Sequence, residues 1–168
     1  MPGEKFLKQT NGGLVETIAT QVGGAPNADK IPALDANGRL DVTMMPSGIG
    51  ADTNTVTASE ALAAGDLVNV YNLAGNARVR KADATSPGKE ANGFVIAAVA
   101  NGATATVYSE GTNGQVSGLT PGQQFLSTTP GLATNVAPSA SGNVLQRVGV
   151  AFSGTSLNFE AGIPITLA

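Results

Sequence analysis

The sequence predicts an all-β protein, a short-stranded β-sandwich or barrel with an extended N-terminal arm. From about Thr55 onward, short runs suited to strands recur at intervals of roughly 10 residues with turn residues between them, which is typical of sandwiches and barrels. The chain holds 22 Gly and 9 Pro, a composition that favours turns over long helices. The first 53 residues lack this rhythm, so we expect an arm over residues 1–53 and a β domain over residues 54–168.

The arm is expected to begin with a β-hairpin. Two short runs, residues 4–9 and 14–22, flank Asn11-Gly12-Gly13, whose tolerance of positive φ suits a tight turn. The second run fits a helix or a strand by spacing, and its many β-branched residues favour the strand. An extended segment, residues 31–41, then reverses at Asn37-Gly38. Because its glycines and prolines leave no periodic apolar face, we expect the arm to pack against the main domain or a neighbouring subunit.

In the β domain the sequence predicts eight strands and one helical turn. The strands are expected at residues 67–72, 77–81, 93–100, 104–110, 123–128, 144–152, 155–160 and 163–167. Alternation is clearest near the end of the chain, where one face is expected to hold Val144, Gln146, Val148, Val150 and Phe152, and another Ile163, Ile165 and Leu167. On this pattern Phe152 belongs to the core. Residues 59–64, capped by Ser59 and stopped by Gly65, suggest a short helix.

The composition argues against an enzyme. Histidine, cysteine and tryptophan are absent, which removes imidazole bases, thiolate nucleophiles and the commonest zinc and copper ligands. The acidic side chains could still pair as in a glycosidase, but the chain offers few aromatic platforms for sugars. The stretch from Asp35 to Asp41 has its glycine at the fourth position, where a calcium loop of the EF-hand type needs it at the sixth, so an ordinary turn is expected. We expect no catalytic residue, no cofactor, no metal site and no small-molecule substrate.

The charge distribution points to assembly. A net charge of −3 is the wrong sign for a nucleic-acid binder, and no apolar run approaches the roughly 20 residues of a membrane helix. We therefore expect neither nucleic acid nor a membrane as a partner, and we expect synthesis in the cytoplasm. Between residues 101 and 168 the only charged side chains are those of Glu110, Arg147 and Glu160. A surface so poor in charge is expected to be covered by other chains in a homo-oligomer. The alternative is an uncharged but hydrated surface.

Eleven residues are candidate contacts with another protein or with another subunit. Nine are apolar residues of the arm: Phe6, Leu7, Leu14, Ile18, Ile31, Leu34, Leu40, Met44 and Met45. The other two, Arg78 and Arg80, stand at strand spacing on one face and could clamp an acidic partner. A solvated or salt-bridged strand face is the commoner explanation for two arginines in this arrangement.

Several strings resemble structural proteins of tailed bacteriophages. In the arm they are Lys5-Phe6-Leu7-Lys8, residues 27–41 and residues 45–52; in the β domain they include residues 64–70, 121–128 and 146–151. The resemblance covers nearly the whole chain and is to head decoration (capsid cement) and head-fibre-like proteins. It implies a homotrimer without a catalytic motif that sits on the outer capsid surface of the virion and bridges the major capsid protein at local three-fold positions. A tail-fibre or baseplate attachment module, binding a receptor or another virion protein, is the alternative that the arm leaves open.

Overall fold

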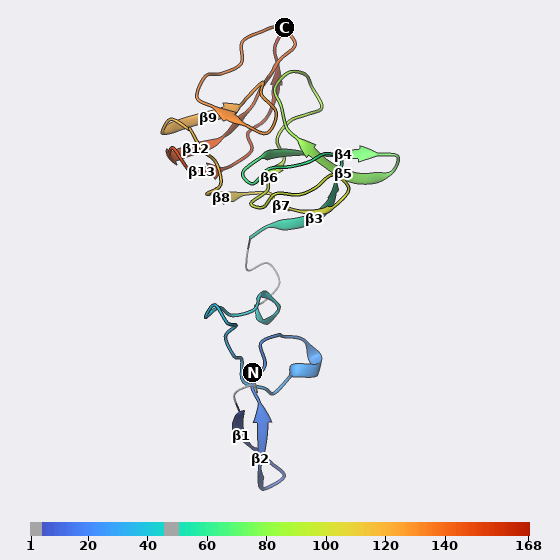
Figure 1. Cartoon of the computed structure of the whole chain (residues 1–168), viewed down its shortest axis with the longest axis vertical. Helices are drawn as coiled ribbons and strands as arrows, with labels where there is room; N and C mark the ends of the chain where they lie inside the picture. The colour runs from blue at the N-terminus through green and yellow to red at the C-terminus, as the bar shows by residue number, and fades with distance from the viewer. Residues whose placement is uncertain (1–4, 46–50) are drawn as a thin grey trace. The chain divides into compact units, whose positions relative to one another are not determined.

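The computed structural model describes residues 5–45 and 51–168 and confirms the predicted all-β class (Figure 1). Within these residues the only helical elements are two 3-10 turns, η1 (Ala25–Asn27) and η2 (Val42–Met44). The chain divides into two compact units, Met1–Gly50 and Ala51–Ala168, here called unit 1 and unit 2.

Unit 1 contains one β-hairpin. Strands β1 (Lys5–Thr10) and β2 (Gly13–Ile18) pair antiparallel, as the Asn-Gly signal predicts. Asn11 and Gly12 have φ values of 50° and 81°, the two positive angles that a tight two-residue hairpin turn requires. The second strand ends at Ile18, earlier than expected, and the only further β pairing among the described residues of the unit is a parallel bridge between Thr20 and Pro32.

The second predicted reversal in unit 1 is also present. Gly38 has a φ of 73°, and its N–H donates to the carbonyl of Asp35 at 3.0 Å. The Asp35 Oδ1 atom accepts from the N–H groups of Asn37 and Arg39, at 2.8 and 2.9 Å. The Asp35 carboxylate therefore caps the backbone N–H groups of its own turn, which is an ordinary reverse turn.

Unit 2 begins with a closed five-stranded barrel. The order around the barrel is β3 (Thr53–Ala58), β5 (Asn76–Lys81), β4 (Leu67–Leu73), β6 (Gly93–Phe94) and β7 (Thr104–Tyr108). Strands β3 and β5 run parallel, and the other pairs are antiparallel. Small and β-branched side chains dominate the interior: Ala58, Leu62, Val68, Val79, Val95, Ala105 and Val107. Such side chains suit the narrow lumen of a five-stranded barrel.

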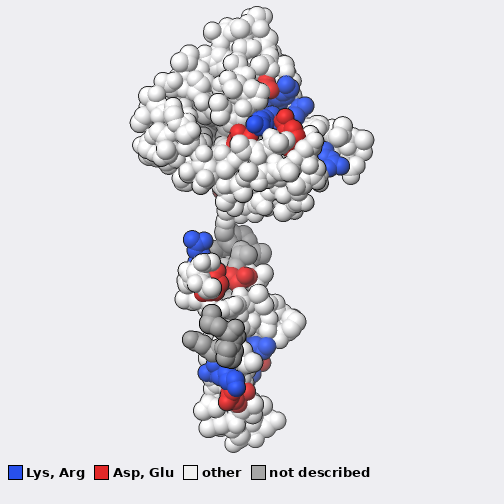
Figure 2. Space-filling view, in the orientation of Figure 1, with Lys and Arg blue, Asp and Glu red and all other residues white. Residues whose placement is uncertain are grey.

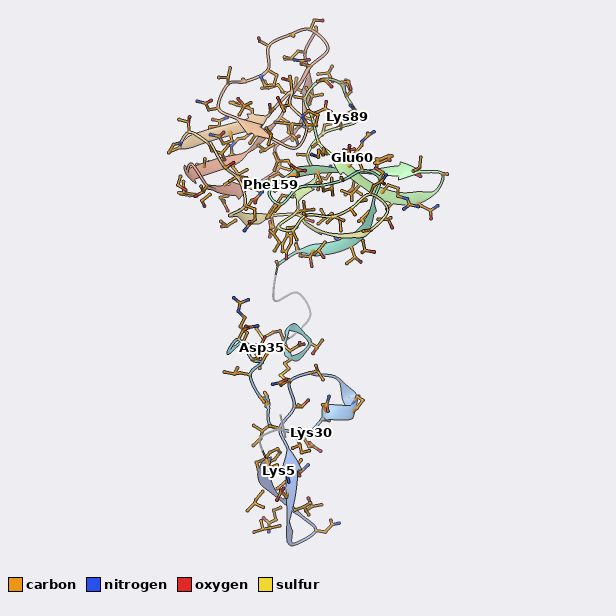
Figure 3. All side chains as sticks on the ribbon, viewed as in Figure 1. Lys5, Lys30, Asp35, Glu60, Lys89 and Phe159 are labelled. Carbon is orange, nitrogen blue, oxygen red and sulfur yellow. The ribbon has the colours of Figure 1, made fainter. Side chains whose placement is uncertain are left out.

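A second sheet packs beside the barrel. Its order is β10 (Ala133–Thr134), β9 (Gly122–Leu126), β12 (Arg147–Ser153), β13 (Ser156–Phe159) and β8 (Gly111–Asn113), and a separate pair joins β11 (Val144–Leu145) to β14 (Ile165–Thr166). A second core includes Leu67, Phe94, Leu126, Val148, Leu157 and Phe159. Figure 3 labels Phe159, whose ring meets that of Phe94 edge-on with 5.6 Å between centroids.

The barrel wall between the two cores is buried on both faces. Leu67 belongs to the second core and its neighbour Val68 to the barrel core, and Phe94 and Val95 are divided in the same way. Successive side chains of a strand point to opposite faces, so a wall with an apolar interior on each side needs consecutive apolar residues. This arrangement fixes the barrel against the second sheet within unit 2.

The predicted helix at residues 59–64 is wrong. Strand β3 is followed there by a bend, and Leu62 pairs with Val99 through two backbone hydrogen bonds of 2.9 Å. Leu62 is buried in the barrel core. Tertiary pairing therefore outweighs the helical preference of a segment little longer than one turn.

The predicted core position of Phe152 is also wrong, because its side chain is 73% exposed. A β-bulge lies upstream: Arg147 pairs with Phe125 and Gly149 with Gln124, so β12 advances two residues while β9 advances one. Gly149 carries the bulge with a φ of 135°. The extra residue reverses the alternation, so Ala151 is buried and Phe152 faces out.

Other differences concern strand lengths. The strand expected at 93–100 is reduced to Gly93–Phe94 and an isolated bridge at Val99. The one expected at 163–167 is reduced to Ile165–Thr166, and both Ile163 and Ile165 are exposed. Strands β3, β8 and β10 were not predicted. The last two have three and two residues, too few to produce a period in the sequence.

Candidate functional site

The most unusual surface feature of unit 1 is its exposed aliphatic side chains. Nine are at least 40% exposed: Leu7, Leu14, Val15, Ile18, Val22, Ile31, Leu34, Leu40 and Met45. Seven of these are predicted contact residues; the sequence analysis missed Val15 and Val22. No side chain described for residues 5–45 is buried. Unit 1 itself therefore leaves these side chains uncovered.

Two predicted contact residues behave differently. Phe6 and Met44 are each partly covered within unit 1. Phe6 lies opposite Thr17 in the hairpin, and Thr17 is partly covered as well. The structure therefore places these two side chains nearer to the interior of unit 1 than the other seven.

In unit 2 the charged side chains gather around β4, β5 and the loop that follows β5. Figure 2 shows this mixed group of basic and acidic side chains on an otherwise largely uncharged visible face of the unit. It surrounds a recess of about 310 Å³ lined by Ser59, Glu60, Tyr71, Arg80, Lys81, Asp83, Lys89 and Pro130. Figure 3 labels Glu60 and Lys89 within it.

Two ion pairs support the wall of this recess. Lys81 Nζ lies 3.2 Å from Asp66 Oδ2, and Lys89 Nζ lies 3.0 Å from Asp83 Oδ2. Both carboxylates are almost fully buried, with side-chain exposures of 6% and 5%. Each lysine therefore neutralises a buried charge that would otherwise cost free energy.

The hydrogen bonds of Asp83 influence its titration. Burial by itself raises the pKa of this carboxyl, but the hydroxyl and the N–H of Thr85 donate to the carboxylate, and so does Lys89. Together these donors hold the pKa of Asp83 below its ordinary value of 3.8. The native fold therefore favours the ionised form of the Asp83 carboxyl.

Arg80, a predicted contact residue, secures the loop after β5. Its Nε donates to Asn69 Oδ1 at 3.0 Å and its Nη2 donates to the carbonyl of Gly88 at 2.7 Å. Its guanidinium also lies 4.2 Å from the centroid of the Tyr71 ring, a cation–π contact. These bonds join β4, β5 and the loop, so Arg80 has a structural role within unit 2.

Arg78 occupies the same outer face, opposite Tyr71 in the pairing of β4 with β5. Its Nε is buried without a hydrogen-bond partner among the described residues. Neither arginine lies within 4 Å of a carboxylate oxygen in the part of the chain that the structure describes. A salt-bridged strand face does not account for this pair of arginines, and Arg78 remains a predicted contact.

Exposed apolar side chains also occur in unit 2, outside the predicted set. The most exposed are Val136, Phe152 and Ile163, at 70%, 73% and 88%. Strand alternation assigned two of them to strand faces, and only the bulge and the observed pairing reveal that they point outward. Within residues 5–45 and 51–168, no three acidic, histidine or cysteine side chains are grouped closely enough to hold a metal ion.

The described residues form no helix with the length and apolarity to cross a membrane.

No protein-family model and no curated protein matches this chain. Among solved structures, it is similar to the head fiber gp8.5 N base in bacteriophage phi29, with 12% sequence identity and a TM-score of 0.47 over 71% of this chain and 95% of that chain. This identity is too low to transfer the role of any residue. The candidate site of this chain is therefore defined by its own exposed surfaces.

Proposed function

We propose that this chain is a structural protein of a tailed-bacteriophage virion. In this proposal it decorates the outer surface of the head as a homotrimer and stabilises the contacts between major capsid proteins. Support comes from the sequence strings described above and from the surfaces of the two units.

The observation that carries the proposal is the composition of the surface of unit 1. Monomeric proteins rarely expose large contiguous apolar areas, and such areas mark sites of association. Unit 1 exposes nine large aliphatic side chains and buries none of its described ones. Hydrophobic burial is the main favourable term in folding, so this unit gains it only by packing against a surface outside itself, and in this proposal that surface belongs to a neighbouring subunit or to the capsid.

Unit 2 supplies a second kind of surface. Between residues 101 and 168 it carries only three charged side chains, and it exposes Val136, Phe152 and Ile163. The cores of protein interfaces are depleted in charge and enriched in aromatic residues. This uncharged area suits contacts with neighbouring subunits or with the capsid.

The proposed mechanism is mechanical. DNA packaging pressurises the shell, and a trimer that spans several capsid subunits adds contact area that resists their separation. A stable interface buries about 1,600 Å² in total, and multivalent attachment raises the strength of modest contacts. The protein then acts through buried area and needs no reactive group.

The test is reconstitution on heads of the phage that encodes the chain. Expanded empty heads that lack the protein are mixed with the purified full chain, and bound copies are counted by quantitative mass spectrometry. We expect saturable binding of hundreds of copies per head and a higher temperature of head opening, with bovine serum albumin as the protein control. Light scattering of the unbound chain should give three subunits.

Two outcomes would contradict the proposal. A monomeric chain that leaves heads bare has no decorating role. A chain found at a few to tens of copies on purified tails would instead be the tail attachment module.

A further inference from the structure

One cationic side chain of unit 2 has no polar partner in the structure. Unit 2 carries five cations, and four of them form an ion pair or a side-chain hydrogen bond within the unit: Arg80, Lys81, Lys89 and Arg147. The fifth is Arg78, which forms no ion pair within the described chain and whose buried Nε has no hydrogen-bond partner. Its positive charge is therefore the one in unit 2 that still needs a partner.

The strands on both sides of Arg78 hold its side chain in place. Arg78 pairs with Tyr71 on β4 and with Thr57 on β3, and directly paired residues share a face of the sheet. All three side chains are half-buried, and the next residue, Val79, points into the barrel core. A side chain held in this way loses little freedom on binding, and arginine is common among the residues that dominate interfaces.

Unit 1 offers Arg78 no unengaged carboxylate among its described residues. Glu16 and Asp29 form ion pairs with lysines of the same unit. Asp35 and Asp41 accept hydrogen bonds from the backbone N–H groups of their own turns. The described acids of unit 1 are thus already used within that unit.

Unit 2 has two unengaged carboxylates. Five of its seven acids form ion pairs or accept backbone hydrogen bonds: Glu60, Asp66, Asp83, Glu90 and Glu160. Asp52 and Glu110 remain; both are exposed, and neither lies within 4 Å of a cationic nitrogen in the described chain. Since Arg147 pairs with Glu160, Glu110 is the one charge between residues 101 and 168 without an ion pair.

These two carboxylates lie at the opposite end of β3 from Arg78. The carbonyl of Asp52 accepts from the N–H of Ser109 at 2.9 Å, so Asp52 and Glu110 are together where β3 begins and β7 ends. Arg78 is level with Thr57, five residues further along the extended chain, which is roughly 16 Å. Unit 2 therefore keeps the free cation and the free anions of one copy apart.

We propose that Arg78 of one copy binds the Glu110 carboxylate of the next copy around the homotrimer, with Asp52 beside it. This rests on the homotrimer of the proposed function and assigns a contact in unit 2. A cyclic trimer repeats a head-to-tail contact, in which one patch meets a different patch of the neighbouring copy. Opposite charges at two separate places on each subunit meet this requirement, and they also fix the orientation of the copies.

Charge reversal in the full chain tests the pairing. R78E and E110K should each raise the concentration at which half of the chain is trimeric, by roughly tenfold or more, in analytical ultracentrifugation. The double variant should restore trimers because it re-forms the pair with the charges exchanged. Since positions 78 and 110 are held apart within one copy, this rescue requires two copies.

Arg39 provides the matched control. It is exposed in unit 1, and it has no carboxylate within 4 Å among the described residues. R39E makes the same change of charge as R78E, but it should neither dissociate trimers nor rescue E110K. Rescue by R39E in place of R78E would place Glu110 against unit 1 and overturn the inference. Trimers of R78E and E110K as stable as those of the wild type would overturn it as well.

Neutral variants protect the test against misfolding, because Arg78 is half-buried. R78Q and E110Q should each weaken the trimer while the β circular dichroism of unit 2 is unchanged. The double variant should be no weaker than either single variant, since residues in direct contact are not additive. Losses that simply add would show that the two side chains do not meet.

Head binding separates failure of this inference from failure of the proposed function. If R78Q and E110Q stay trimeric but R78Q no longer binds expanded heads, Arg78 contacts the shell, so the inference is wrong and the decorating role stands. If the wild-type chain is monomeric both in solution and on heads, the homotrimer and this contact are wrong together.

Discussion

The two units of this chain place their apolar residues in opposite ways. Unit 2 holds all of the buried hydrophobic residues described, and most of them form two clusters that share a barrel wall. Unit 1 buries none of its described side chains and exposes nine large aliphatic ones. The chain therefore separates a unit that buries apolar side chains within itself from a unit that leaves its apolar side chains without cover of its own.

This comparison teaches that apolar content alone does not predict a core. Unit 1 has leucine, isoleucine and valine in abundance, but Gly23-Gly24, Pro26 and Pro32 interrupt its pattern before a third strand can cover the hairpin. In unit 2, turns separate strands that pair in closed or five-stranded arrangements. The two units therefore differ in whether their apolar side chains pack against other apolar side chains of the same unit.

The largest expected effect on this comparison comes from F159A. Phe159 is 1% exposed and packs edge-on against Phe94 in the second core. Removing its ring should lower the free energy of unfolding of unit 2 by about 3–5 kcal/mol, since it leaves a cavity. Urea unfolding followed by circular dichroism at fixed protein concentration measures the change.

The control is F152A, which removes the same ring from a side chain that is 73% exposed. It should change the free energy of unfolding by no more than about 0.5 kcal/mol, as is usual at surface positions. If F152A proved the costlier of the two in the trimeric chain and not in the monomer, Phe152 would belong to a subunit interface. Equal large costs in a monomer would refute the outward orientation of Phe152.

The second effect in size is expected from G149A. A Cβ at this position would lie 2.0 Å from the carbonyl oxygen of Asn158, and the φ of 135° disfavours any residue but glycine. Strain and displacement of β13 should together lower stability by about 2–4 kcal/mol. Thermal unfolding at matched concentration measures it.

G154A is the matched control for the bulge. Gly154 follows the same strand, has no positive φ, and a Cβ added there would meet only the Leu119 carbonyl oxygen, at an ordinary 3.4 Å. A small change is expected from this substitution. Should G149A be as mild as G154A, β12 would not carry a tight bulge, and the reason given for the exposure of Phe152 would fail.

A third and smaller effect is expected from Q146L. Gln146 is 2% exposed; its Oε1 accepts from the N–H of Ala91 at 2.8 Å, and its Nε2 donates to the carbonyls of Ala91 and Gly162. Leucine leaves these buried backbone groups without partners, at a cost of about 1–3 kcal/mol. Chemical unfolding tests this against Q123L, since Gln123 is exposed on the neighbouring strand. A neutral Q146L would show that water replaces the amide.

Much of the fold follows from local signals in the sequence. The Asn11-Gly12 turn predicts the hairpin because both residues must adopt positive φ, and they do. Strands β4, β5, β7, β9 and β13 fall within a few residues of their predicted positions. By contrast, the orientation of Phe152 depends on the residue inserted at Gly149 and on a second register shift, between Ala151 and Ser153, in the pairing of β12 with β13. The local sequence does not show which glycine of a strand carries a bulge.

The candidate site is harder to predict than the fold. Composition identifies the apolar residues of unit 1, but only the pairing register shows that Leu7, Leu14 and Ile18 share a face while Phe6 does not. The spacing of Arg78 and Arg80 predicts one shared face but cannot show that Arg80 is engaged by Asn69 and Gly88. Register and loop closure are tertiary properties, which a single strand does not encode.

The smallest effect concerns pH and again contrasts the two units. The pKa of Asp83 in folded unit 2 lies below the ordinary value of 3.8, so folding favours the carboxylate form. The carboxylate therefore stabilises the fold above the ordinary pKa, and this stabilisation is lost as the pH falls through the lower pKa of the folded state. D83N should therefore lower the unfolding midpoint of unit 2 at pH 7, and the difference from wild type should shrink as pH is lowered below 3.8.

The control is D35N in unit 1. The hydrogen bond from the backbone N–H of Arg39 likewise lowers the pKa of Asp35, but that carboxyl caps an exposed turn. D35N should therefore leave the midpoint of unit 2 unchanged at every pH. Unfolding by circular dichroism from about pH 7 down to about two units below the ordinary carboxyl pKa measures both variants. A midpoint of unit 2 that moved with D35N would mean that the two units unfold together, and the contrast between a self-sufficient unit and a dependent one would be lost.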